Sequence, residues 1–255
     1  MNSIQIPQNK KIYFLSDAHL GLPPREKSLE REKILTRWMD EIRLDAHSIY
    51  FLGDIFDYWF EYRKVVPRGF TRVLGKIAEI TDSGIPVYFF TGNHDVWIYD
   101  YLPSETGIQV FRKPIKLNIN GKKFFLAHGD GLGKYEKGYK VIKKIFTSPV
   151  LQWLFARIHP NASTTFAHWW SKHSRLSKEE FLPFLGENKE VQVLFSREML
   201  KKEHFDFFVY GHRHLPLSFP LAENSELICL GDWFINFTYA VFDGINIELK
   251  HFEKK

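Results

Sequence analysis

The feature that most constrains this chain is an apolar run that leads directly into a cluster of polar, ligand-type residues. Residues 86–90, Pro-Val-Tyr-Phe-Phe, have the length and composition of a buried strand, and Thr91-Gly92-Asn93-His94-Asp95 follows at once. Gly-Asn is a common turn pair, so the segment alone is equally consistent with a simple turn at the end of a strand. In α/β proteins, however, ligands bind outside the carboxyl ends of strands. Whether these side chains form an active site therefore depends on what the other strands deliver.

Other apolar runs end in the same kind of residue. In an extended segment the side chains of residues i and i+2 share one face, so an Asp-x-His sequence presents both ligand-type groups together. Such polar ends are Asp17 with His19 after residues 10–15, Asp54 after residues 48–52, His128 after residues 123–127, and His212 with His214 after residues 205–210. Five strand ends thus supply carboxylate, imidazole and amide groups, and we expect them to form one site.

Helical segments separate the first three strands. Residues 28–43 and 68–81 carry apolar residues at helical spacing, and strands that alternate with helices predict parallel βαβ units. Asn120-Gly121 predicts a hairpin, because Asn-Gly is the strongest short hairpin signal. Residues 226–230 and 239–250 are predicted to be short antiparallel strands that complete a sheet. The predicted fold class is therefore α/β.

The chain is predicted to be a single domain, 1–255, because it has no linker rich in Pro, Gly or Ser and no internal repeat. Residues 131–204 form an insertion of different character, in which helical segments mix lysines with large apolar side chains such as Trp153 and Trp169. One interpretation is a helical subdomain with its own small core and a solvated basic face. The other is a lid or membrane-facing cap, since basic amphipathic helices with Trp and Phe suit an anionic lipid surface.

Charge and cysteine content limit the compartment and the partners. The net charge of +5 and the pI near 9.1 favour anionic partners: phosphorylated substrates, nucleic acid or an anionic membrane surface. Neither a spanning apolar run nor a signal peptide is present, so we expect a cytoplasmic protein. The single cysteine, Cys229, lies in an apolar run and is expected to be a buried, inert thiol.

The ligand types indicate a metal site. Imidazole, carboxylate and amide groups suit divalent Mn, Fe, Zn or Co, and the absence of cysteine ligands argues against a structural zinc site. A carboxylate shared between two groups of ligands suggests two ions, about 3.5 to 4 Å apart, as in metal-assisted hydrolysis of phosphoesters. A site with two divalent ions is therefore predicted, and Mn, Fe, Zn and Co all suit its ligands.

The order of the motifs carries a family resemblance. Asp-x-His, Gly-Asp-x-x-Asp, Gly-Asn-His-Asp, a single His and Gly-His-x-His follow one another between Asp17 and His214. This set resembles the calcineurin-like metallophosphoesterase superfamily, which implies a four-layer αββα sandwich with two central sheets. By motif, the first metal would be held by Asp17, His19, Asp54 and His214, and the second by Asp54, Asn93, His128 and His212.

The resemblance also implies how such a site would work. The two metals would lower the pKa of a bridging water and polarise the phosphoryl oxygens, so that hydroxide attacks phosphorus in line. His94 would be the acid that assists the leaving group, oriented by Asp95 or another acceptor. Asp57 and Asp95 are also consistent with a purely structural role in fixing their loops.

Within the superfamily, the chain is most similar to the UDP-2,3-diacylglucosamine hydrolases, the lipid A pathway pyrophosphatases that release UMP and lipid X. The similarity lies in the overall length, the long helical insertion after His128-Gly129-Asp130, and the tail Leu230-Gly231-Asp232-Trp233. It implies a lipid-linked nucleotide substrate, a cap that forms a groove for acyl chains, and a peripheral location on the inner face of the cytoplasmic membrane. The substrate contacts that it implies are Asn93, Glu136, Ser174 and His212.

One departure from that family keeps other functions open. Its well-known members have Gly-Asn-Arg-Asp where this chain has Gly-Asn-His-Asp, so the substrate contact of the arginine does not carry over to His94. The alternative is a related metallophosphoesterase that acts on another nucleotide or lipid-linked phosphodiester. A non-catalytic scaffold of this fold is disfavoured because every motif residue is present. Nucleic-acid binding is not expected, since the basic residues of the insertion are interspersed with large apolar ones. The sequence predicts no particular oligomeric state.

Overall fold

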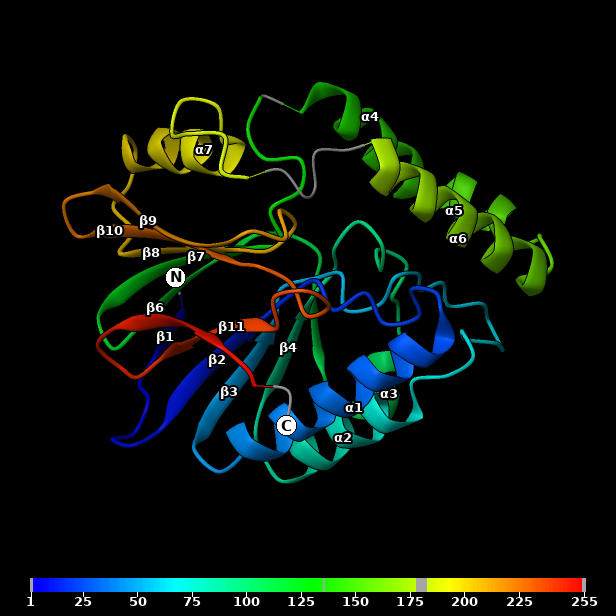
Figure 1. Ribbon diagram of the computed structural model, residues 1–255, viewed down its shortest axis with the longest axis horizontal. Coiled ribbons are helices and arrows are strands. Elements are labelled where there is room, and N and C mark those ends of the chain that lie inside the picture. Colours follow the sequence, from blue (N-terminus) through cyan, green and yellow to red (C-terminus); the bar gives the residue numbers. More distant parts are fainter. Residues whose placement is uncertain (1, 135, 178–182, 254–255) are drawn as a thin grey trace.

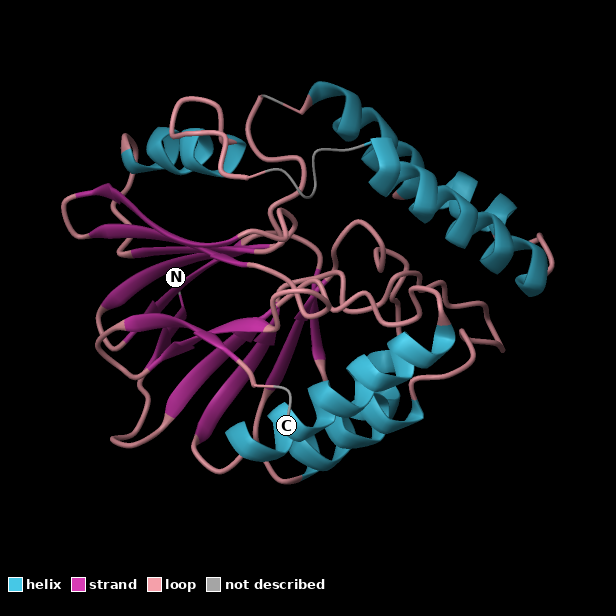
Figure 2. Cartoon of the chain, in the orientation of Figure 1, coloured by secondary structure: helices cyan, strands magenta, loops and turns pink. Residues whose placement is uncertain are grey.

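A computed structural model of the chain describes residues 2–134, 136–177 and 183–253. Two six-stranded sheets pack face to face, with helices covering the outer face of each (Figures 1 and 2). Each sheet is thus buried on one side by the other sheet and on the other side by helices. The predicted α/β class and four-layer αββα sandwich are confirmed.

The first sheet has the strand order β12-β11-β2-β3-β4-β5. Strands β2 (Lys11–Leu15), β3 (Ala46–Phe51), β4 (Val87–Phe90) and β5 (Gln109–Phe111) are parallel, and helices α1 (Arg25–Ile42), α2 (Thr71–Asp82) and α3 (Tyr101–Thr106) connect them. The predicted βαβ units are therefore present. Strands β11 (Thr238–Phe242) and β12 (Ile247–His251) form an antiparallel hairpin that adds to β2.

The second sheet has the strand order β1-β6-β7-β8-β10-β9. Its strands are β1 (Asn2–Ile4), β6 (Ile115–Ile119), β7 (Lys122–Ala127), β8 (Phe207–Tyr210), β9 (Pro216–Ala222) and β10 (Ser225–Leu230). The hairpin predicted at Asn120-Gly121 is the β6–β7 pair. Strand β10 is antiparallel only to β9 and runs parallel to β8, so the expectation of purely antiparallel pairing was wrong on that side. Strand β9 was not predicted, because Pro216 and Pro220 interrupt its pattern; both are tolerated at the edge of the sheet.

Three apolar clusters hold the layers together. Phe14 and Phe124 stack across the space between the sheets, with ring centroids 6.1 Å apart. Trp38 and Trp233, with ring centroids 5.5 Å apart, pack between the first sheet and its helices. The third cluster, which includes Val193, lies between the second sheet and helix α7 (Val191–Leu200). These clusters fix the strands whose ends carry the polar motifs.

The insertion has two structurally different parts. Helices α4 (Lys137–Phe146), α5 (Pro149–Phe155) and α6 (Pro160–Ser177) lie together beside the sandwich, above the loops that leave the strand ends (Figure 1). Helix α7 instead covers the second sheet and is one of the four layers, with Val193 fully buried. We call α4, α5 and α6 the cap helices. None of the helices within the described residues is long and apolar enough to cross a membrane.

Candidate metal centre

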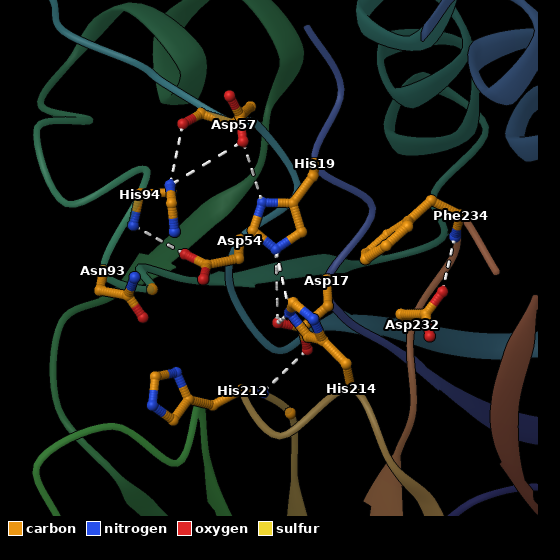
Figure 3. A network of polar contacts seen from close by, with 12 residues as sticks. Asp17, His19, Asp54, Asp57, Asn93, His94, His212, His214, Asp232 and Phe234 are labelled. Carbon is orange, nitrogen blue, oxygen red and sulfur yellow. Dashed lines mark hydrogen bonds and ion pairs between the residues drawn. The ribbon is translucent and has the colours of Figure 1, made fainter. Parts of the chain in front are cut away.

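The polar motifs converge because the strands that precede them end at the same edge of the sandwich. Strands β2, β3 and β4 of one sheet and β7 and β8 of the other deliver the predicted ligands, several of which point toward one another in Figure 3. Five of these ligands have positive φ angles: Asp17 (54°), His19 (42°), Asp54 (53°), His212 (71°) and His214 (51°). Non-glycine residues seldom adopt this conformation, and its concentration in one place is typical of a functional site.

Neighbouring glycines allow the loops to approach the carboxylates. A Cβ atom on Gly92 would lie 2.1 Å from Asp54 Oδ1, and one on Gly211 would lie 2.5 Å from Asp17 Oδ2. Both separations are far inside van der Waals contact, so neither position accepts a side chain while the carboxylates stay in place. The glycines of the Gly-Asn-His-Asp and Gly-His-x-His motifs therefore have a steric reason to be there.

The first group of ligands contains Asp17, His19 and His214, and all three are buried. The Nε2 atoms of His19 and His214 face each other at 3.1 Å. Asp17 Oδ1 lies 3.1 Å from His214 Nε2 and 3.8 Å from His19 Nε2. Two imidazole nitrogens and a carboxylate oxygen thus converge on one point. A divalent cation suits this donor set.

The second group contains Asp54, His128 and His212. His128 Nδ1 lies 2.7 Å from the Leu52 carbonyl oxygen, which can only accept a hydrogen bond, so Nδ1 carries the proton. A neutral His128 then turns the lone pair of Nε2 toward Asp54 Oδ2 at 3.2 Å and Asn93 Oδ1 at 3.3 Å. Three acceptors that face one another require a cation or an added proton between them. The residues present therefore fit a bound metal.

Asp54 joins the two groups. Besides its place beside His128, it forms a third close group with His19 and His94. Its Oδ1 accepts a hydrogen bond from the backbone N–H of His94 at 2.8 Å (Figure 3). Asp54 thus lies close both to His19 of the first group and to His128 of the second, which is the position expected of a bridging ligand.

His94 is oriented by Asp57. Its Nδ1 donates to the Asp57 carbonyl oxygen at 3.0 Å and lies 4.0 Å from Asp57 Oδ1. The carboxyl group of Asp95 is used differently, because it accepts backbone N–H groups from Gly92 (2.7 Å) and Ile55 (2.9 Å), and so ties two loops together. The structure thus places Asp57 against the imidazole ring of His94, whereas the Asp95 carboxyl group is engaged by the backbone.

Burial and neighbouring charges perturb the acids and bases of the site. Burial acts to raise the pKa of Asp54, but His128 and His94 hold it well below its usual value. Burial acts to lower the pKa of His128, and Asp54 reverses this and raises the pKa well above its usual value. Burial, with the nearby charge of Asp54, raises the pKa of Asp95 to about 7. Such strong coupling is typical of functional clusters of titratable groups.

Side chains outside the predicted set support the ligands. The ring of Phe234 meets the rings of His19 and His214 edge to face, at 5.7 and 5.3 Å between centroids. Asp232 holds that turn by accepting the backbone N–H of Phe234 at 2.9 Å (Figure 3). The tail motif Leu-Gly-Asp-Trp signalled this segment, but its link to the ligands arises only from tertiary packing.

Two of the expected substrate contacts, Glu136 and Ser174, belong to the insertion and not to the strand ends. Glu136 precedes helix α4, and its Oε2 accepts the backbone N–H of Leu132 at 3.2 Å. Ser174 belongs to helix α6, but its side chain lies outside the described part of the structure. Next to Glu136, the Tyr139 hydroxyl donates to Asp130 Oδ2 at 2.5 Å and links the cap to the end of β7.

An apolar cavity adjoins the site. Its volume is about 250 Å³, and it begins at Asn93 and His94 and continues between the cap helices. Its walls include Trp97, Ile145 and Phe155, and the rings of Trp97 and Phe155 stack with centroids 5.5 Å apart. A hydrophobic group attached to a ligand at the metal centre would find an apolar environment here.

The chain is similar to several known proteins. The family model described as calcineurin-like phosphoesterase matches residues 10–216. A UDP-2,3-diacylglucosamine hydrolase of Porphyromonas gingivalis is 41% identical over 256 residues, covering 95% of this chain and 98% of that protein. A hydrolase of the same name from Shewanella baltica is 26% identical, covering 94% and 98%. Among solved structures, a phosphoesterase from E. coli covers 95% of this chain and 100% of its own, with 17% identity and a TM-score of 0.41. The family match spans every ligand-bearing strand end.

Proposed function

This chain belongs to the calcineurin-like phosphoesterase family, and we propose that it hydrolyses the pyrophosphate bond of UDP-2,3-diacylglucosamine to release UMP and lipid X. Family membership makes it a metal-dependent hydrolase. The substrate assignment rests on the near full-length similarity to a hydrolase named for that substrate. The observation in this chain that carries it is the apolar cavity that starts at Asn93 and His94, because such a substrate brings a pyrophosphate and acyl chains to one place.

We propose that two divalent ions, Mn in the first instance, bind the groups described above. Asp17, His19, Asp54 and His214 would hold one ion, and Asp54, Asn93, His128 and His212 the other. When bound, such ions polarise phosphoryl oxygens and supply hydroxide near neutral pH. The mixture of imidazole, carboxylate and amide ligands supports Mn but also accommodates Fe, Zn or Co.

The chain's own residues then act on the substrate. In its doubly protonated form His94 would keep its Nδ1 proton on the Asp57 carbonyl oxygen and donate the proton on Nε2 to the leaving group. Asp95 would act indirectly, by fixing the two loops that carry Asp54 and His94. Asn93 and His212 would contact the phosphates, and Glu136 and Ser174 would contact the remainder of the substrate.

We also propose that the cap helices rest on the inner face of the cytoplasmic membrane, where this substrate resides. Helix α5 exposes Val150 (67%), Trp153 (57%) and Leu154 (51%), a large apolar surface for a water-facing helix. Arg157 lies over the ring of Trp153 at 4.4 Å, so a cation accompanies the apolar residues. Basic residues beside Trp and Leu suit an anionic interface.

Direct assay tests the substrate. Purified protein with Mn²⁺ should release UMP from UDP-2,3-diacylglucosamine, and Asp54→Asn should abolish the release because the shared carboxylate is lost. Hydrolysis of a chromogenic phosphodiester without release of UMP would leave the chemistry intact and refute the substrate. That outcome would favour the second candidate, another nucleotide or lipid-linked phosphodiester, for which His94 in place of the family arginine is the motivating feature.

A further inference from the structure

A second cavity lies beyond Tyr58, away from the metal ligands. Its volume is about 780 Å³, and it is bounded by the N-terminal turns of α1 and α2, the loop 58–70 and the first turn of α6. Of the described residues that line it, Tyr58 alone also lines the apolar cavity beside His94. The second cavity is therefore a neighbouring site and not an extension of the metal centre.

The charge of this cavity is positive. Among the described residues, Arg25, Arg68 and Arg72 line it together with a single carboxylate, Glu32, which gives three positive charges against one negative charge and a net charge of +2. None of the three guanidinium groups makes a hydrogen bond or ion pair with another described residue, although Arg25 and Arg72 act on Glu32 through their charge. Three arginines are thus available to an anionic ligand.

Two helix ends add to this field. Helix α1 begins at Arg25 and helix α2 at Thr71, and residues of both first turns line the cavity. The residues before them, Pro24 and Phe70, provide no side-chain cap to the first N–H groups. The N-terminal end of a helix carries a partial positive charge and free N–H donors, so both ends favour an anion, phosphate above all.

The remaining wall is apolar. Leu29, Val65, Val66 and Phe70 line the cavity beside the arginines, and Val65 is 49% exposed. A small inorganic anion would leave this surface in contact with water. A ligand that joins a phosphate to an apolar group would cover both parts of the wall.

We infer that this cavity is a second binding site for a phosphate-bearing amphiphile, with its phosphate among Arg25, Arg68 and Arg72 and its apolar part against Leu29, Val65 and Val66. The site is separate from the substrate site proposed above. The ligand could be the headgroup region of a membrane phospholipid or a soluble phosphorylated compound, and the two are distinguished by the probes below.

Calorimetric titration of the Mn²⁺-loaded protein with two probes tests the inference. Dihexanoylphosphatidylglycerol below its micellar concentration represents the lipid, and inorganic phosphate represents a free anion. Replacing all three arginines with Gln should weaken binding of the lipid probe at least about tenfold, the size of one charge-assisted hydrogen bond. Arg63→Gln, on the same exposed loop but outside the lining, should bind like the wild type.

Glu32→Gln should change the affinity in the opposite direction, because it removes the negative charge that faces the arginines. Equal affinity of the wild type and the triple variant would overturn the site. If inorganic phosphate binds as tightly as the lipid probe and depends on the same arginines, the apolar residues contribute nothing to binding, and the inference of an amphiphilic ligand is wrong. If the triple variant does not fold, Arg68→Gln decides, since Arg68 lies in a loop. Hydrolysis of a chromogenic phosphodiester should stay unchanged in every variant, so failure here is distinguishable from failure of the proposed hydrolase.

Discussion

Asp57 contacts two imidazole rings at once: its Oδ1 lies 3.3 Å from His19 Nδ1, and its backbone carbonyl oxygen lies 3.0 Å from His94 Nδ1 (Figure 3). One loop residue therefore sets the orientation of a proposed metal ligand and of the proposed acid. In metal sites such outer contacts fix the tautomer of the histidine and raise its basicity.

Asp57→Asn should weaken Mn²⁺ binding and lower activity by about 10-fold to 100-fold, the usual loss when a carboxylate that orients a metal-binding histidine is removed. Titration of the metal-free protein with Mn²⁺ and assay of the chromogenic phosphodiester measure the two effects. Asp82→Asn, an exposed carboxylate at the end of α2, provides the control. An unchanged Mn²⁺ affinity in Asp57→Asn would show that the carboxylate only shapes the loop.

Glu61 stabilises the start of α3. Its Oε2 accepts the backbone N–H groups of Tyr99, Asp100 and Tyr101 at 2.8, 2.8 and 3.1 Å. Glu61→Gln removes the charge that faces these donors and should lower the free energy of unfolding by about 1 to 3 kcal/mol. Thermal unfolding measures the loss, with exposed Glu105→Gln in the same helix as the control. Equal melting temperatures for the two variants would refute the prediction.

Asp45 should contribute to the pH dependence of the free energy of unfolding. Burial acts to raise its pKa, but Lys11 at 2.7 Å and the Tyr13 hydroxyl at 2.6 Å outweigh burial and leave the pKa below its usual value. A lowered folded-state pKa contributes stability above the unfolded pKa, which is lost as the pH falls through the folded pKa.

The difference in unfolding free energy between the wild type and Asp45→Asn should therefore be constant above about pH 5 and shrink below about pH 4. Urea unfolding of both proteins from neutral pH down to about pH 3 measures it. If this difference in unfolding free energy grows as the pH falls, the pKa of Asp45 is raised in the folded protein and not lowered.

Phe155 links the cap to the sandwich. Its ring packs between those of Phe60 (4.9 Å) and Trp97 (5.5 Å), and it lines the cavity beside His94. Phe155→Ala should raise the KM for the lipid substrate several-fold and leave hydrolysis of a chromogenic phosphodiester almost unchanged. Leu44→Ala, at an exposed apolar position outside the cap helices and outside the lining of the cavity, serves as the control. Equal losses on both substrates would show that the ring supports the metal centre and not the lipid.

The sequence predicted the motif-bearing strand ends because each follows a regular apolar run, as residues 86–90 do before Asn93. The supporting contacts could not be predicted in the same way. Phe234 reaches His19 from a turn more than two hundred positions away, and only packing brings the two rings together. The sequence likewise could not predict that α7 packs on the second sheet, because the apolar pattern of Val191–Leu200 would be the same in a cap helix as in a layer of the sandwich.

The position of α7 has a consequence for the evolution of this scaffold. Strands β7 and β8 are parallel neighbours, paired from Phe124 with Phe207 to Ala127 with Tyr210, and a parallel pair requires a crossover connection. Of the described helices in the connection between these strands, α7 is the one that packs on the sheet, so the chain topology does not need the cap helices. Lengthening, shortening or exchange of residues 137–177 would preserve the strand register and the ligands on both strands. Substrate range could thus diversify by replacement of one continuous segment while the hydrolytic centre is inherited intact.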